Sequence, residues 1–288
     1  MRYSDLFAAA LRQSGKNEMS TAIEILIENS FAISRSRFWI QKNQVIRDAS
    51  GLRRFRRRLR RLLANEPLAY ILGEKEFFGH VFAVSPAVLV PRPETELLVE
   101  KALAILNGKP AVPPRSDGAR VLDIGAGSGC IAITIALHSP ATVMALEKSR
   151  PALRVLKKNI ARFGLQARVR PLSGDLFPRA CEPCEPCEMI VANPPYLSRR
   201  DLQQAPRNVR LFEPHEALLA GANGTEVLAR IIAGAPRRLV PGGCLLLEIG
   251  QGQRFRVTNF LKAAGLREIE CVRDYAGIER VSVAQKDS

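Results

Sequence analysis

The chain has 288 residues, 47% of them hydrophobic and 25% charged, which suits a soluble protein with one large α/β domain and a small one. No apolar run approaches the ~20 residues of a membrane-spanning helix, and the first residues lack a signal-peptide pattern, so we expect no membrane contact and a cytoplasmic location. The net charge of +15 favours polyanionic partners such as RNA, ribosomes or acidic proteins, although a solvated basic surface carries the same charge.

Residues 1–73 are predicted to form a small helical domain, because they show short helical patterns and no convincing strand. Within this domain, Ser50 is predicted to cap a helix over residues 51–64. Apolar residues recur at helical spacing along that helix, and seven arginines lie between them. Such a run usually packs its apolar side and leaves the arginines in water, and contact with RNA or the ribosome is the functional alternative.

The rest of the chain predicts a hairpin followed by alternating strands and helices. Residues 74–91 are predicted as a hairpin linker, and a helix is predicted to begin at Pro93, because proline and acidic residues suit a first helical turn. Strands are predicted over 120–125, 142–147, 167–175, 188–193, 242–250, 267–274 and 279–285, and helices over 128–139, 151–164 and 225–239. This rhythm predicts an α/β fold with a mostly parallel, doubly wound sheet that binds its ligand at the carboxyl ends of the strands.

Three successive strand ends carry features of a nucleotide site. The first strand runs into a glycine loop of Gly125, Ala126, Gly127, Ser128 and Gly129, whose G-x-G-x-G spacing differs from the dinucleotide fingerprint G-x-G-x-x-G. Glu147 ends the second strand, where a carboxylate accepts hydrogen bonds from ribose hydroxyls. Asp175 ends the third strand, where its carboxylate suits the amine of adenine, and Leu176 or Phe177 suits the adenine ring. Each feature alone has a packing explanation, but together they favour an adenosine-type cofactor over NAD.

The fourth strand runs directly into Asn193, Pro194, Pro195 and Tyr196, which we predict to bind the substrate and to carry the catalysis. Consecutive prolines fix φ and remove two backbone donors, so the turn presents carbonyl oxygens. The Asn193 side-chain oxygen and the Pro194 carbonyl then offer two acceptors to the two hydrogens of a planar –NH₂ group, and Tyr196 adds an aromatic face. An amide nitrogen is a poor nucleophile, and such acceptors stabilise the positive charge that develops on it.

Several longer runs extend these local patterns. They are 65–73 (NEPLAYILG), 89–96 (LVPRPETE), the glycine loop, 193–196 (NPPY), 212–214 (FEP) and 274–281 (DYAGIERV). Together they resemble the bacterial peptide chain release factor glutamine methyltransferases over nearly the whole chain. The resemblance implies a class I (Rossmann-like), seven-stranded methyltransferase domain over 92–288, behind a helical domain that helps to grip the substrate. It also implies methyl transfer from S-adenosyl-L-methionine to the glutamine of the Gly-Gly-Gln loop of release factors.

The resemblance assigns roles by position. Residues 125–129 and Glu147 would bind the methionine and ribose parts of the cofactor, Asp175 and Leu176 the adenine side, and residues 193–196 the glutamine amide, with Asn193 also bordering the cofactor. The chain departs from the family pattern at three positions. Ala126 replaces a frequent threonine, Glu147 a usual aspartate, and Leu176 an occasional aromatic residue.

Other functions share parts of this pattern. A glutamine methyltransferase that acts on a ribosomal protein shares the core, and an adenine-amine nucleic-acid methyltransferase shares NPPY but needs a module for base flipping. A non-catalytic RNA-binding protein on the same fold is a third alternative, against which the intact glycine loop, Glu147 and NPPY argue. Cys181, Cys184 and Cys187 are spaced like part of an iron–sulfur run, but a fourth nearby cysteine is missing. We interpret them as a surface-loop insertion and predict no metal, with metal binding as the lesser alternative.

Overall fold

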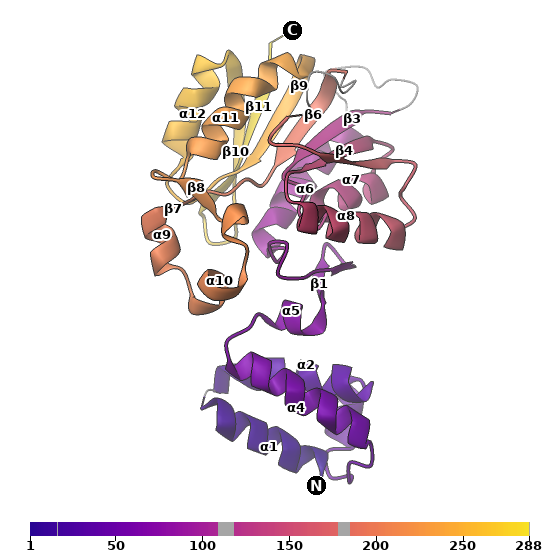
Figure 1. Cartoon of the computed structure of the whole chain (residues 1–288). Coiled ribbons are helices and arrows are strands. Elements are labelled where there is room, and N and C mark those ends of the chain that lie inside the picture. The colour runs from indigo at the N-terminus through magenta and orange to yellow at the C-terminus, as the bar shows by residue number, and fades with distance from the viewer. Residues whose placement is uncertain (16, 109–117, 178–184, 288) are drawn as a thin grey trace. The chain divides into compact units, whose positions relative to one another are not determined.

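The computed structural model describes residues 1–15, 17–108, 118–177 and 185–287 (Figure 1). The chain divides into two compact units. The helical unit comprises Met1–Gly73 together with Arg207–Phe212, and the sheet unit comprises Glu74–Pro206 and Glu213–Ser288. Within the described residues, no helix is long and apolar enough to cross a membrane.

The helical unit packs short helices around one apolar core. Its helices are α1 (Tyr3–Ser14), the 3-10 turn η1 (Asn17–Met19), α2 (Ser20–Phe31), α3 (Arg35–Ile40), α4 (Ala49–Leu63) and α5 (Leu68–Leu72). Helix α10 (Arg207–Phe212) belongs to the same unit but contributes no buried residue to this core. On α4, Phe55, Leu59 and Leu62 are buried and join residues of α2 such as Leu26 in the core. The apolar side of α4 is therefore packed, as its periodicity predicts.

Helix α4 begins earlier than predicted, and the prediction that Ser50 caps it is wrong. Asp48 is the N-cap, and its Oδ1 accepts a hydrogen bond from the backbone N–H of Gly51 at 2.9 Å. The Ser50 hydroxyl instead donates to the same oxygen at 2.7 Å. These hydrogen bonds hold the pKa of Asp48 below its usual value, and the bond from Gly51 contributes most. A carboxylate two residues upstream is the stronger acceptor, and it takes the capping position from the serine.

A mixed sheet of seven strands forms the centre of the sheet unit, in the order β10-β11-β9-β6-β3-β4-β5. The strands are β3 (Arg120–Ile124), β4 (Thr142–Glu147), β5 (Val169–Ser173), β6 (Cys187–Ala192), β9 (Leu239–Glu248), β10 (Leu266–Arg273) and β11 (Glu279–Lys286). The five from β9 to β5 are parallel, and β11 pairs antiparallel with both β9 and β10. Because the chain leaves β3 to one side for β4 and later returns to the other for β6, the ends of these strands form a topological switch point.

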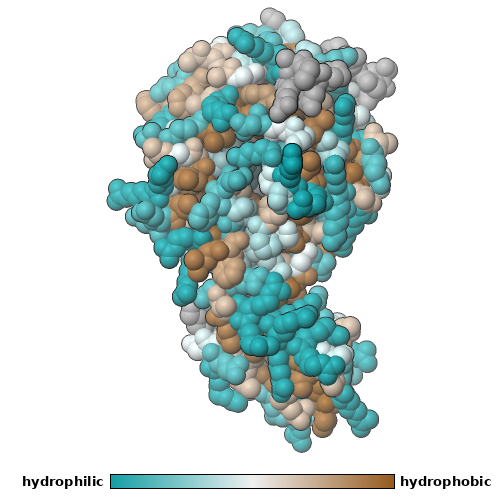
Figure 2. Space-filling model, viewed as in Figure 1, coloured by the Kyte–Doolittle hydropathy of each residue, from teal (hydrophilic) through white to brown (hydrophobic). Residues whose placement is uncertain are grey.

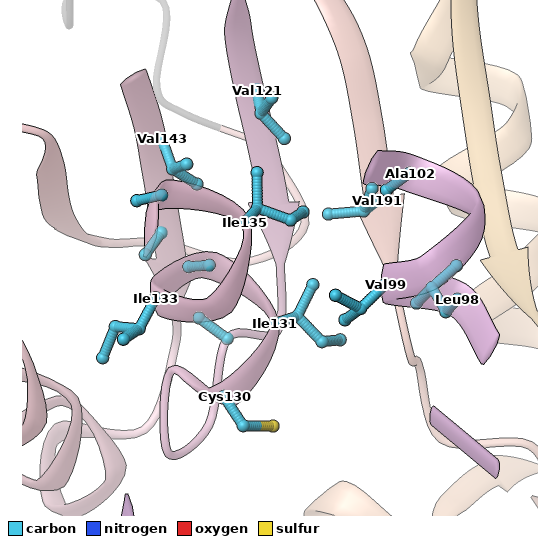
Figure 3. Close-up of a cluster of buried hydrophobic side chains, with 14 of the residues drawn as sticks. Leu98, Val99, Ala102, Val121, Cys130, Ile131, Ile133, Ile135, Val143 and Val191 are labelled. Atoms are coloured by element: carbon cyan, nitrogen blue, oxygen red, sulfur yellow. The ribbon is translucent and has the colours of Figure 1, made fainter. Parts of the chain in front are cut away.

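Helices cover both faces of this sheet, as expected for a doubly wound fold (Figure 1). One core includes α6 (Pro93–Asn107), α7 (Cys130–His138) and α8 (Arg150–Arg162), and the other includes α11 (Glu226–Gly234), the 3-10 turn η3 (Ala235–Arg237) and α12 (Arg254–Ala263). On β3, Val121 belongs to the first core and Leu122 to the second, because successive strand residues point to opposite faces. Figure 3 shows the first core, where Ile131 of α7 points toward Val99 of α6 and Ile135 lies beside Val121.

A short hairpin precedes the large sheet. Strands β1 (Glu74–Phe77) and β2 (His80–Ala83) pair antiparallel within the predicted hairpin segment. Asn159 of α8 brackets the backbone of Ala83, because its Oδ1 accepts from the Ala83 N–H at 2.8 Å and its Nδ2 donates to the Ala83 carbonyl at 2.9 Å. The hairpin is thus attached to α8 by a buried amide.

Residues 197–221 form elements that were not predicted from the sequence. These are β7 (Leu197–Ser198), α9 (Arg199–Gln204), α10, the 3-10 turn η2 (His215–Ala217) and β8 (Leu219–Gly221). Strands β7 and β8 form a small parallel pair immediately after NPPY. Helix α12 was also not predicted, although its buried Val257 and Leu261 lie four residues apart, as on one face of a helix.

Candidate active site

A cavity opens at the carboxyl ends of β3, β4, β5 and β6, and with its open mouth it measures about 1170 Å³. It brings together ten of the twelve predicted site residues, namely Gly125, Ala126, Gly127, Ser128, Glu147, Asp175, Leu176, Asn193, Pro194 and Pro195. The other two, Gly129 and Tyr196, adjoin this lining in the chain: Gly129 caps α7 and Tyr196 follows Pro195. The cavity lies at the switch point, where doubly wound sheets bind their ligands.

The glycine loop turns sharply from β3 into α7. Its three glycines have positive φ, with Gly129 at 83°, a conformation that other residues rarely adopt. A Cβ on Gly129 would lie only 2.5 Å from the Leu156 side chain, so the loop packs too closely on α8 for a larger residue. The backbone N–H groups of Gly125 and Ala126 both donate to the Leu146 carbonyl at 2.9 Å, which ties the loop to the end of β4.

Glu147 organises this loop from the end of β4. Its Oε2 accepts from the Gly127 N–H at 2.9 Å, and its Oε1 accepts from the Ser149 N–H at 2.8 Å. A carboxylate oxygen accepts more than one hydrogen bond, so each oxygen keeps capacity for a ligand hydroxyl. The side chain therefore fixes the loop and also lines the cavity.

The adenine side of the predicted site differs in detail from the sequence interpretation. The Asp175 carboxylate is exposed and forms an ion pair with Arg230 of α11 at 2.8 Å. Arg230, which also lines the cavity, was not singled out in the sequence. Leu176 has a φ of 60°, which is unusual for a residue with a branched side chain and marks a sharp turn at the cavity wall.

The side chain of Asn193 is held from one end. Its Nδ2 donates to the Thr95 hydroxyl at 2.9 Å, and Thr95 donates in turn to the buried carboxylate of Glu248 at 2.7 Å. Within the described part of the chain, the Asn193 Oδ1 is buried and has no hydrogen-bond partner. One acceptor of the proposed amide site is thus unsatisfied beside the cavity.

The rest of the tetrapeptide is anchored to the end of β9. Gln253 donates from Nε2 to the Tyr196 carbonyl at 2.9 Å and accepts from the Gly250 N–H at 2.9 Å. Burial raises the pKa of Tyr196 to about 12, so its hydroxyl stays protonated at neutral pH. The sequence had identified the tetrapeptide but not this anchor, because Gln253 lies 57 residues away.

Two buried carboxyl groups lie close to the site. Burial raises the pKa of Asp123, at the end of β3, and that of Glu248, at the end of β9, to about 7 each. Arg92, which lines the cavity, pairs with the buried Glu213. Sequence reasoning gave Glu248 no role, although it lies in a predicted strand, and it treated Arg92 and Glu213 only as parts of longer runs.

Comparisons with known proteins agree on one family. Residues 5–73 match the family model described as PrmC N-terminal domain, and residues 109–221 match that described as Methyltransferase small domain. A release factor glutamine methyltransferase of Bordetella pertussis is 48% identical over 223 residues, which cover 77% of this chain and 78% of that protein. One of Cereibacter sphaeroides is 35% identical over 289 residues, which cover 99% of each.

The chain belongs to the release factor glutamine methyltransferase family. The family predicted from the sequence runs is therefore confirmed. Among solved structures, a methyltransferase from Pyrococcus furiosus superposes with a TM-score of 0.54 at 19% identity, over 81% of this chain and 99% of that one. This member of the family thus has the predicted class I (Rossmann-like) methyltransferase fold.

The cysteine run of this family member lies mostly outside the described residues, which exclude Cys181 and Cys184. Cys187 begins β6 and is buried, with its Sγ 3.3 Å from the Arg238 carbonyl. Within the described ranges, no three histidine, cysteine, aspartate or glutamate side chains gather as metal ligands.

Proposed function

We propose that this protein transfers the methyl group of S-adenosyl-L-methionine to the side-chain amide nitrogen of the glutamine in the Gly-Gly-Gln loop of peptide chain release factors, in the cytoplasm. Membership of the release factor glutamine methyltransferase family supports this activity. The observation that carries the site assignment is the buried Oδ1 of Asn193 beside the cavity, which has no hydrogen-bond partner in the described ranges of the chain. An unpaired buried acceptor is costly, and an incoming N–H group satisfies it.

The residues present fit the methyl donor, which supplies an electrophilic methyl group when bound. The glycine loop leaves room for a close approach, since a Cβ at Gly125 would meet no atom within 4 Å. Glu147 keeps free lone pairs for the two ribose hydroxyls while it holds the loop. Asp175 and Leu176 form the adenine side of the proposed site, where the Asp175–Arg230 pair offers both a charged acceptor and a cation.

The acceptors at NPPY explain how an amide nitrogen becomes reactive. The Asn193 Oδ1 and the Pro194 carbonyl each accept one hydrogen of the glutamine –NH₂ group in the proposed complex. As the bond between the nitrogen and the methyl group forms and the methyl–sulfur bond of the donor breaks, the nitrogen becomes positively charged, and both hydrogen bonds strengthen at that moment. Loss of one N–H proton to solvent then leaves a neutral N-methyl amide. Tyr196, with its raised pKa, remains a neutral aromatic neighbour.

We further propose that residues 1–73 dock the release factor, with 74–91 as the connecting hairpin and 92–288 as the methyltransferase domain. The match of residues 5–73 to a separate N-terminal family model supports an independent role for this segment. Deleting residues 1–73 would remove only part of a compact unit that also contains α10, so docking is better tested with surface substitutions in that unit. Docking predicts that such substitutions raise the Michaelis constant for the release factor and leave cofactor binding unchanged.

The basic face of α4 supports contact with RNA. Figure 2 shows hydrophilic side chains over this helix, and Arg53, Arg56, Arg57 and Arg60 are exposed along one groove. Within the described chain these four make no ion pair, whereas Arg61 pairs with Glu66. Replacing three of them by glutamine should weaken binding of a short RNA and reduce its salt dependence. The triple glutamine variant at Arg256, Lys262 and Arg267 removes the same charge elsewhere and serves as the control.

One labelling experiment separates the candidate activities. The protein is incubated with methyl-labelled S-adenosylmethionine and, separately, with a release factor, ribosomal proteins and adenine-containing DNA. Label on the release factor glutamine, and none on a factor that carries glutamate there, is the expected result. Label on a ribosomal protein or on DNA in place of the release factor contradicts the proposal.

A further inference from the structure

A continuous hydrogen-bond chain runs from the proposed substrate site to a buried acid. Asn193 Nδ2 donates to Thr95 Oγ1 at 2.9 Å, and Thr95 Oγ1 donates to Glu248 Oε2 at 2.7 Å. Thr95 and Glu248 are each 2% exposed, so water does not compete for these bonds. These two hydrogen bonds join three elements that are remote in sequence: the first turn of α6, the end of β9 and the turn after β6.

The direction of these hydrogen bonds, from donor to acceptor, decides which end of the Asn193 amide faces the substrate. A threonine hydroxyl has one hydrogen, and Thr95 gives it to the Glu248 carboxylate, which only accepts when ionised. Oγ1 can then only accept from Asn193, so the amide must turn its –NH₂ group toward Thr95. Among the residues that the structure describes, the Oδ1 atom is left without a partner, as a substrate acceptor has to be.

We propose that Thr95 and Glu248 are positioning residues that fix the orientation of the Asn193 amide, so that its oxygen accepts a hydrogen of the substrate amide. The proposal rests on the proposed methylation of a glutamine amide. The positioning role goes beyond that activity, because it assigns the orientation of the acceptor oxygen to two residues outside NPPY.

Protonation of Glu248 reverses the direction of the hydrogen bonds through Thr95. A protonated carboxyl group can donate to Thr95 Oγ1, which releases the threonine hydrogen toward Asn193 and favours the opposite amide orientation. Burial raises the pKa of Glu248 to about 7, and the Thr95 hydrogen bond and Arg280 oppose that rise. The ionisable groups that face Glu248 from the surrounding elements are Arg92, Glu94, Cys130, Tyr196 and Arg280. The orientation therefore depends on pH close to neutrality.

A purely structural role is the competing interpretation, since the Thr95–Glu248 bond also ties α6 to β9. The two roles differ in what they change. A structural tie affects the melting temperature and all activities alike, whereas amide orientation affects the methyl-transfer step and its pH dependence.

The test compares single-turnover methyl transfer to a release factor by the full-length wild type, Thr95→Val, Thr95→Ser and Thr134→Val. Valine at 95 removes the acceptor, and we expect a rate about tenfold lower with the dissociation constant for S-adenosylmethionine within threefold of wild type. Serine at 95 should restore most of the rate. Thr134 is equally buried but its hydroxyl has no partner among the described residues, so Thr134→Val should change nothing. A wild-type rate for Thr95→Val overturns the proposal.

Two further measurements keep the outcome decisive. In an Asn193→Ala background Thr95→Val should cost nothing more, because no amide remains to orient, and an equal further loss there overturns the relay. A normal rate for Asn193→Ala alone refutes the amide clamp itself. The wild-type rate should rise with pH through about 7, and Glu248→Gln should abolish that rise. The same rise in the glutamine variant, or no rise in the wild type, also overturns the proposal.

Discussion

The replacement of Glu147 by alanine tests the cofactor side of the site. Its two carboxylate oxygens already accept from the backbone N–H groups of Gly127 and Ser149, and we assign their remaining lone pairs to the ribose hydroxyls. Alanine removes both functions at once: the ribose loses its acceptors, and the glycine loop loses the side chain that holds it.

The expected effect is the loss of hydrogen bonds to a charged group. A hydrogen bond to a charged group contributes about 1.5–3 kcal/mol, which corresponds to a roughly 10- to 150-fold weaker dissociation constant for S-adenosylmethionine. Glu147→Gln retains an acceptor at one oxygen position but places a donor at the other, so its loss should lie between wild type and alanine. The melting temperature of each variant without cofactor shows how much of the loss comes from a disordered loop.

Isothermal titration calorimetry with S-adenosylmethionine measures these constants directly. A second titration with S-adenosylhomocysteine, which has the same ribose, should show the same ratio between wild type and Glu147→Ala. A dissociation constant for Glu147→Ala within twofold of wild type would refute the assignment of the ribose to Glu147.

Two predictions concern stability. Burial raises the pKa of Glu248 from 4.5 to about 7, so the folded state binds this proton more tightly than the unfolded state, and the contribution of Glu248 to stability falls as pH rises between those values. At about 1.4 kcal/mol per pH unit, this pKa shift changes the free energy of unfolding by about 3 kcal/mol. Urea unfolding should therefore show Glu248→Gln gaining about that much stability relative to wild type between pH 5 and pH 8. A difference between the two proteins that stays constant with pH would contradict the raised pKa of Glu248. Phe55 is fully buried in the helical unit, and Phe55→Ala should lower its free energy of unfolding by about 3–5 kcal/mol, whereas a loss below about 1 kcal/mol would show that α4 does not hold this core.

Local patterns in the sequence were enough to predict much of the sheet unit. Parallel strands that are buried on both faces read as continuous apolar runs, so the β3–α7–β4–α8 rhythm was visible without a structure. The glycine loop and NPPY each follow such a strand directly, and their meeting at one edge follows from parallel topology. The family assignment from these runs is confirmed by the comparisons. The individual roles of the site residues remain predictions.

The features that the sequence did not predict depend on contacts across long stretches of chain. Thr95 and Glu248 are separated by 153 residues, and no local pattern indicates that a threonine in a first helical turn meets a strand-end acid. The Arg230–Asp175 pair spans 55 residues in the same way. The error at Ser50 has a local cause, because two good capping residues compete within three positions and the carboxylate of Asp48 prevails.

We propose above all that Asn193 acts on the transition state of methyl transfer to a glutamine amide. The most direct test is the single-turnover rate of Asn193→Ala with a release factor at saturating S-adenosylmethionine. Since the bond to Asn193 strengthens as the nitrogen gains charge, we expect a rate about 10²–10³-fold lower, with cofactor affinity within about threefold of wild type. A rate equal to that of the wild type would contradict it.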